Sequence, residues 1–328
     1  MNTSPGHRGV NLSGRKSASY HSRTALCCLL ASALLPLSCA TYDSVVPTWN
    51  DLMQATTTAQ SAINLHFEEH GSGEPVLFIH GFGANTYSWR HLIPLLSARH
   101  RLLLVDLKGF GKSPKPQDND YAIYHQVRLL AAFIRQHDLR NPTIVGHSYG
   151  GGIALLLALH LADDERVRPK RLVLIDSMAY RQSLPLFLKI LRTPVAGAAS
   201  VSMLPSRLQA RAVLKLAYYD DAKIPAEAIT AYAEPLDMPG GRHAALRTAQ
   251  QMIPPDFESI QKRYKEISIP TLILWGREDA VVPLRVGEQL HADIPNSKLV
   301  VLDRCGHIPH EEMPEAAGFV VADFLRNP

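Results

Sequence analysis

Residues 143–161 read TIVGHSYGGGIALLLALHL, and this stretch decides the fold that the chain can adopt. A short apolar run, 143–145, enters a G-x-S-x-G pentapeptide at 146–150, and a second apolar run, 153–161, leaves it. A serine on a sharp strand-to-helix turn needs glycines two positions to either side, because side chains there would clash. The pattern predicts that the turn lifts Ser148 above a sheet edge, where the N-terminus of the following helix stabilises negative charge.

Outward from this turn, strand patterns alternate with helical patterns. Short continuous apolar runs, typical of buried parallel strands, occur at 75–79, 101–106, 143–145, 171–175, 271–275 and 298–302. Residues 63–67 alternate apolar and polar side chains like an outer strand, and helical patterns fall at 124–137, 148–161 and 284–294. Such alternation predicts an α/β fold, with a mostly parallel central sheet and helices on both faces.

One long segment interrupts the alternation. Between Asp176 and about Ile267 there is no buried-strand run, only helical pieces separated by prolines and rich in aromatic and methionine side chains. The strand pattern resumes at Thr271, so we expect a core of 63–177 and 262–328 and an inserted helical cap at 178–261. A second independent domain is the alternative.

Serine needs a general base, and a histidine in the right place follows the last strand run. His307 lies between that run and a final helical stretch, so it belongs to the same carboxyl edge of the sheet as Ser148. The rival histidines are His80, His147 and His310.

The base in turn needs an acid that fixes its tautomer. Asp279 follows the strand run 271–275, and the chain order Ser148, Asp279, His307 is that of the α/β-hydrolase triad. Asp176, at the end of an earlier strand run, is the main alternative. Glu278 is adjacent to Asp279, and Asp303 lies four residues before His307.

Acyl transfer also requires donors that face the developing oxyanion. The glycine-containing loop 80–84 (HGFGA) follows a strand run, so we expect the N–H groups of Phe82 and Tyr149 to form this oxyanion hole. No metal and no cofactor are expected, because the histidines lack ligand-type spacing and no phosphate or dinucleotide motif is present.

From about Ile63 to Leu325 the chain resembles the α/β-hydrolase superfamily, in the capped group that includes esterases, lipases and carbon–carbon bond hydrolases. The motifs that carry the resemblance are HGFGA (80–84), DLKGFGKS (106–113), GHSYGG (146–151), GREDAVVP (276–283) and CGHIPHEEMP (305–314). It implies the fold and the triad, with 106–113 as a structural loop near the site. Relatives that hydrolyse epoxides or alkyl halides have Asp in place of Ser148, and the oxyanion loop lacks the glycine–proline variation typical of meta-cleavage-product hydrolases.

Three functions follow as hypotheses. The first is a serine esterase that hydrolyses small apolar ester-type substrates, of medium chain length, through an acyl-enzyme. The second is a carbon–carbon bond hydrolase or perhydrolase with the same triad. The third is a non-catalytic protein that binds a lipid or small molecule in the same pocket.

The chain begins with a leader that predicts export. A basic stretch ends at Arg23, and the uncharged apolar run 25–37 is too short to span a bilayer as a helix, as in a secretory signal. Leu37-Ser38-Cys39 resembles a lipoprotein box, so we expect leader 1–39, a lipid-anchored Cys39 in the cell envelope and a spacer at 40–62, in which a short helix is the alternative. Cleavage after Ala40, giving a periplasmic or secreted protein, and an uncleaved anchor remain as alternatives.

Charge and cysteine content agree with this division. Four of the 34 basic residues precede Asp43, the first acidic residue, which leaves 30 basic against 30 acidic residues beyond the leader. A neutral body without a basic stripe gives no reason to expect nucleic-acid binding. Cys305 is the single cysteine after the leader, so no internal disulfide is possible there.

Overall fold

The computed structural model describes Met1 and residues 48–54 and 64–327, and its helices and strands all belong to one compact unit, Val45–Pro328. A second unit, Met1–Ser44, lies almost wholly outside the described residues, as do the predictions for the leader and Cys39. Within residues 48–54 and 64–327, no helix is long and apolar enough to cross a membrane.

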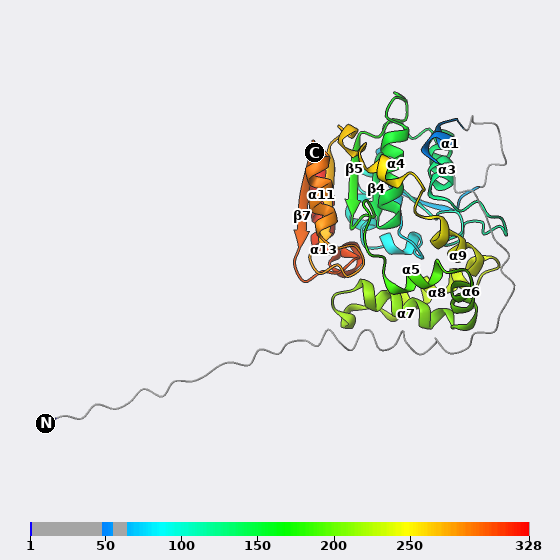
Figure 1. Cartoon of the computed structure of the whole chain (residues 1–328). Coiled ribbons are helices and arrows are strands. Elements are labelled where there is room, and N and C mark those ends of the chain that lie inside the picture. The colour runs from blue at the N-terminus through cyan, green and yellow to red at the C-terminus, as the bar shows by residue number, and fades with distance from the viewer. Residues whose placement is uncertain (2–47, 55–63, 328) are drawn as a thin grey trace. The chain divides into compact units, whose positions relative to one another are not determined.

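The described chain forms a seven-stranded sheet in the order β1-β3-β2-β4-β5-β6-β7. Strands β4, β5 and β7 of this sheet are labelled in Figure 1. The strands are β1 Phe67–His70, β2 Glu74–Ile79, β3 His100–Val105, β4 Thr143–His147, β5 Arg171–Ile175, β6 Thr271–Gly276 and β7 Ser297–Leu302. All neighbouring pairs are parallel except β1 with β3. The predicted α/β fold with a mostly parallel sheet is therefore confirmed.

The outer strand differs from its prediction. It begins at Phe67 rather than at residue 63, because in the antiparallel register Phe67 pairs with Val105, where β3 ends. Residues 64–66 have no strand partner in that register, although Leu65 is buried.

Helices cover both faces of the sheet. Alternate residues of each strand point to opposite faces, so Leu77 and Ile79 join one hydrophobic cluster while Val76 and Phe78 join the other. The first face packs against α3 Ile123–Gln136, α4 Tyr149–His160 and α11 Arg285–Asp293; the second packs against α2 Ile93–Leu96 and α13 Pro314–Arg326.

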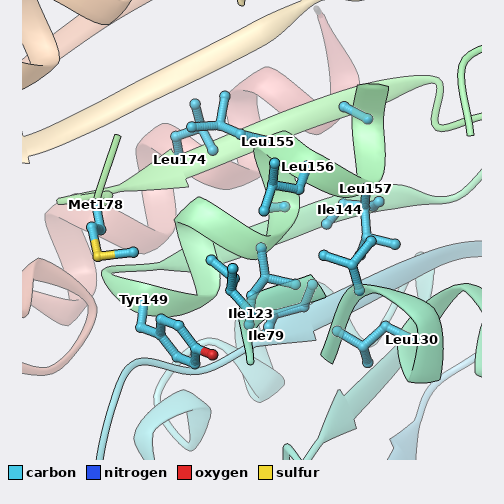
Figure 2. Close-up of a cluster of buried hydrophobic side chains, with 14 of the residues drawn as sticks. Ile79, Ile123, Leu130, Ile144, Tyr149, Leu155, Leu156, Leu157, Leu174 and Met178 are labelled. Carbon is cyan, nitrogen blue, oxygen red and sulfur yellow. The ribbon is translucent and has the colours of Figure 1, made fainter. Parts of the chain in front are cut away.

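Helix α4 is the central helix of the first face. Every one of its residues except the last, His160, is buried, as the apolar run after the pentapeptide predicts. Figure 2 shows Leu155, Leu156 and Leu157 of this helix among side chains from β2, β4, β5 and α3. A helix so enclosed provides a rigid base for the turn that precedes it.

Between β5 and β6 the described chain contains only helices. They are α5 Leu186–Leu191, α6 Pro194–Met203, α7 Ser206–Ala217, α8 Ala226–Asp237, α9 Gly241–Gln251 and α10 Phe257–Gln261, with short 3₁₀ turns at Asp221–Lys223 and Tyr264–Glu266. We call residues 178–261 the cap segment. It shares a small cluster with the core, in which Leu214 and Tyr218 pack with Ile308.

Part of the predicted spacer is folded onto the core. Residues Trp49–Gln54 form α1, where the Trp49 ring lies edge-on to Tyr124 at 6.1 Å and the backbone N–H of Trp49 donates to the Asp256 carboxylate (2.6 Å). Because Trp49 and Leu52 are buried, this stretch of the range 40–62 belongs to the compact unit.

Candidate active site

The turn between β4 and α4 holds Ser148 in a strained conformation. Its φ is 53° and its ψ is −117°, a region that non-glycine residues rarely occupy. Its backbone is held from the neighbouring strand and beyond: the Ser148 N–H donates to the Ile175 carbonyl (3.0 Å), and the Ser148 carbonyl accepts from the Met178 N–H (2.9 Å) as well as from its own helix. A Cβ on Gly150 would lie 2.2 Å from the carbonyl oxygen of Ile79, so glycine is required at that position.

The structure brings Ser148, His307 and Asp279 together. The Ser148 hydroxyl lies 2.9 Å from Nε2 of His307, and Nδ1 of His307 lies 2.7 Å from Oδ2 of Asp279. A carboxylate only accepts hydrogen bonds, so Nδ1 carries the proton and Nε2 is left to accept the proton of the serine. The second Asp279 oxygen, Oδ1, accepts the N–H groups of Val281 (2.7 Å) and Val282 (2.9 Å).

The backbone of His307 is held from two sides. Its N–H donates to the carbonyl of Ala217 at the end of α7 (2.6 Å), and its own carbonyl accepts from Nε2 of His147 (2.8 Å). The imidazole position is therefore set by the cap segment as well as by the core. This contact from the cap segment was not predicted from the sequence.

The three rival histidines are bound elsewhere. Nδ1 of His80 donates to Gly81 (2.8 Å) while its Nε2 accepts from Leu107 N–H (3.0 Å), and burial lowers its pKa. Burial, with His310 and His307 nearby, holds the pKa of His147 well below its usual range. His310 is stacked on Trp89 at 4.5 Å, and burial lowers its pKa to about 3. These rings are neutral at neutral pH and shape the site.

The loop predicted to form the oxyanion hole lies beside the serine. A Cβ on Gly81 would be 3.2 Å from Cβ of Ser148, which places the loop's backbone within reach of an acyl group on that serine. Phe82 follows directly, and its ring packs against Phe110 at 5.6 Å. Tyr149 is the first residue of α4, so its N–H has no acceptor within the helix.

Of the candidate acids, Asp279 is the one that is hydrogen-bonded to His307. Glu278 accepts the Cys305 N–H (3.0 Å), and Asp303 forms an exposed ion pair with Arg277. Asp176 is completely buried next to Asp279: ligand-type atoms of Asp176, Asp279 and His307 lie within 4.8 Å of one another. A cation could be held at that distance, but the Nδ1–H of His307 is already donated to Asp279.

A buried carboxylate that sequence reasoning missed joins the histidine loop to the cap segment. Glu312, in α12 Pro309–Glu312, accepts N–H groups from Gly306 (2.7 Å), Tyr219 (3.0 Å) and Asp220 (2.8 Å). Its neighbour Glu311 pairs with Arg90 (2.5 Å). Two consecutive acidic residues directly after the histidine motif were the available signal, because charged residues are rarely buried without partners.

A cavity of about 560 Å³ lies where both ends of the cap segment join the core. Most residues of 178–184 line it on one side and all of 253–259 on the other, together with Arg192. Ser148, Asp279 and His307 do not line it, so its size says nothing of the space above the serine.

The chain is similar to known proteins of one fold family. The family model for the alpha/beta hydrolase fold matches residues 74–314. A 2-hydroxy-6-oxononadienedioate/2-hydroxy-6-oxononatrienedioate hydrolase of Cupriavidus pinatubonensis is 31% identical, over 80% of this chain and 91% of its own length.

Two solved structures are similar as well. A meta-cleavage product hydrolase from Pseudomonas fluorescens is 28% identical with a TM-score of 0.67, covering 80% of this chain and 94% of that one. A thermophilic esterase from Thermogutta terrifontis is 27% identical with a TM-score of 0.65, covering 80% and 93%. This chain is a hydrolase and belongs to the α/β-hydrolase fold family.

Proposed function

We propose that this protein is a serine hydrolase that cleaves carboxylic esters of apolar acyl groups. The observation that carries the proposal is the continuous hydrogen-bonded chain from the Ser148 hydroxyl through His307 to Asp279. Serine alone is a poor nucleophile at neutral pH, and this arrangement supplies the base that it needs.

The reaction proceeds in two halves. Nε2 of His307 takes the proton of Ser148 as Oγ attacks the ester carbonyl, and Asp279 stabilises the imidazolium that forms. The N–H groups of Phe82 and Tyr149 receive the negative oxygen, each contributing roughly 2.7–4 kcal/mol. His307 then protonates the departing alcohol. In the second half His307 takes a proton from a water molecule as that water attacks the acyl carbonyl, and it then gives the proton to Oγ of Ser148 as the acid leaves.

An apolar, uncharged substrate fits the neighbourhood of the serine best. Beside His307 the cap segment contributes Leu214 and Tyr218 to the cluster around Ile308. Arg90, a cation on this side of the site, is already paired with Glu311. A carboxylate on the substrate would have to compete with Glu311 for it.

Carbon–carbon bond hydrolysis is the second candidate. It is supported by the relatives named for that chemistry at 28–31% identity, a reading that the oxyanion-loop sequence had made less favoured. The same Ser148 and His307 would act on a ketone in place of an ester.

The experiment has two stages. A fluorophosphonate probe should label the full chain, and Ser148→Ala should abolish both labelling and turnover while the protein stays folded by circular dichroism. A labelled Ser148→Ala protein would contradict the assignment, and an unlabelled wild type would favour the binding-protein hypothesis. The wild type is then assayed with p-nitrophenyl esters of increasing chain length and with a meta-cleavage product. Turnover of the meta-cleavage product and of none of the esters would replace the ester proposal with carbon–carbon bond hydrolysis.

We further propose that the protein is exported and anchored to the cell envelope through Cys39. The leader's basic start, short apolar run and terminal Leu-Ser-Cys support this location.

A further inference from the structure

Asp176 is a second acid at the triad that the proposed mechanism does not use. It follows β5, the neighbour of β6, so the parallel sheet places it beside Asp279. Its φ is 43°, an uncommon backbone angle for aspartate, and the side chain is completely buried. Oδ1 accepts the Gly276 N–H (2.9 Å), whereas Oδ2 finds no donor among the described residues.

The two carboxyl groups receive very different numbers of donors. Asp279 is held by three: Nδ1–H of His307 and the N–H groups of Val281 and Val282. Asp176 is held by one. When two buried carboxyl groups share a site they do not both ionise, and the one with fewer donors keeps the proton.

The other groups that face Asp176 give its negative charge no support. Glu312 is acidic, and Cys305 is a buried thiol whose pKa is raised by burial, so neither places a positive charge beside Asp176. Burial, followed by the charge of Asp279, likewise holds the pKa of Asp176 well above its usual range.

We propose that Asp176 is a protonated carboxylic acid whose Oδ2–H donates to the Asp279 carboxylate. It is a positioning residue: it does not touch the substrate, but it fixes the plane of Asp279 so that Oδ2 of that residue faces His307. The catalytic consequence rests on the proposed serine-hydrolase function, whereas the protonation state does not.

The first test is spectroscopic and independent of turnover. The infrared difference spectrum between the wild-type full chain and Asp176→Asn at neutral pH should contain the carbonyl band of a protonated carboxylic acid. Asn is the matched replacement, because its amide can donate to Asp279, accept from Gly276 and adopt a positive φ. A difference spectrum with carboxylate bands in place of the acid band would overturn the proposal.

The second test uses the pH dependence of kcat/KM. Asp176→Asn changes no charge if Asp176 is protonated, so the pH at which activity falls on the acid side should not move. If Asp176 were ionised, removing its charge would weaken the support for the His307 imidazolium and move this limb to lower pH, which would overturn the proposal.

Asp176→Ala removes the donor. We expect kcat to fall about tenfold, equivalent to about 1.4 kcal/mol, and the acid limb to move to higher pH, because the Asp279 charge is then less dispersed. An Ala variant with wild-type kcat and pH profile would show that Asp176 does not position Asp279. If the wild type neither hydrolyses esters nor labels at Ser148, the proposed function fails, and the infrared test still decides the protonation of Asp176.

Discussion

Asp279 differs from the other acidic side chains near the site because it alone combines burial with a hydrogen bond to His307. Asp279→Asn would present an amide N–H or a neutral oxygen to Nδ1 and favour the wrong tautomer. We expect kcat on an ester to fall by about 10⁴-fold with little change in KM. Asp303→Asn is the matched control, since Asp303 is exposed and paired with Arg277; equal losses in both variants would remove Asp279 from its assigned role.

His310 makes stability depend on pH. Its folded-state pKa of about 3 lies below the ordinary 6.5, so the unfolded chain takes up a proton that the folded chain refuses. The stability it contributes is complete above pH 6.5 and is lost as pH falls, by about 2 kcal/mol between pH 7 and pH 5. His310→Phe retains a ring against Trp89 and should reduce the acid sensitivity of the unfolding free energy by that amount. Denaturant titrations at both pH values measure this, with exposed His291→Phe as control; equal acid sensitivity of wild type and His310→Phe would refute it.

At the scale of elements, the short helix α12 connects the histidine loop to the cap segment. Glu312→Gln keeps the shape of the side chain, but it places an amide against the N–H groups that donate to the Glu312 carboxylate in the wild type. Replacing such buried charged bonds should cost about 1–3 kcal/mol of unfolding free energy. Because His307 lies in the same loop, kcat should fall as well.

Exposed Glu315→Gln, three residues further on, is the control for both measurements. Normal ester turnover in a destabilised Glu312→Gln protein would mean that the bonds of the Glu312 carboxylate stabilise the fold without positioning His307.

Elements with a local sequence pattern were predictable, and long-range partners were not. The β4–Ser148–α4 unit and the strands of the sheet follow from apolar runs and glycine spacing, and the candidates His307 and Asp279 follow from their places after strand runs and from the triad order of the family that the chain resembles. The bond between Ala217 and His307 joins positions 90 residues apart through backbone atoms, which leave no mark on side-chain chemistry. The first residue of β1 was predicted wrongly, because it depends on where the partner strand β3 ends, at Val105. The sequence presented Asp176 only as an alternative to Asp279. That the two lie side by side depends on β5 and β6 being neighbours in the sheet, which the sequence pattern does not give.

At the scale of the whole molecule, the folded body carries the candidate active site, and the leader is the part that we propose sets the protein's location. If residues 37–39 act as a lipoprotein box, the mature chain begins at lipid-modified Cys39. It then partitions with membranes, because a lipid chain contributes about 0.8 kcal/mol per buried CH₂ group. Cys39→Ser should release the protein or block its maturation, whereas Cys28→Ser should not. Mass spectrometry of the N-terminus decides; an unmodified Thr41 start would establish signal-peptidase cleavage.

The carbonyl of Ala217 and the carboxylate of Glu312 also set the boundaries for exchanging caps between members of this fold family. A graft that replaces residues 178–261 alone would remove Ala217, Tyr219 and Asp220 but keep their partners His307 and Glu312. The partners would then face a cap with which they were not selected. A recombinant that carries residues 305–312 along with the donor's cap keeps those contacts within one parental sequence. The unit that must be exchanged together in this architecture is therefore discontinuous: a helical insertion, plus a loop and a short helix encoded more than forty residues downstream.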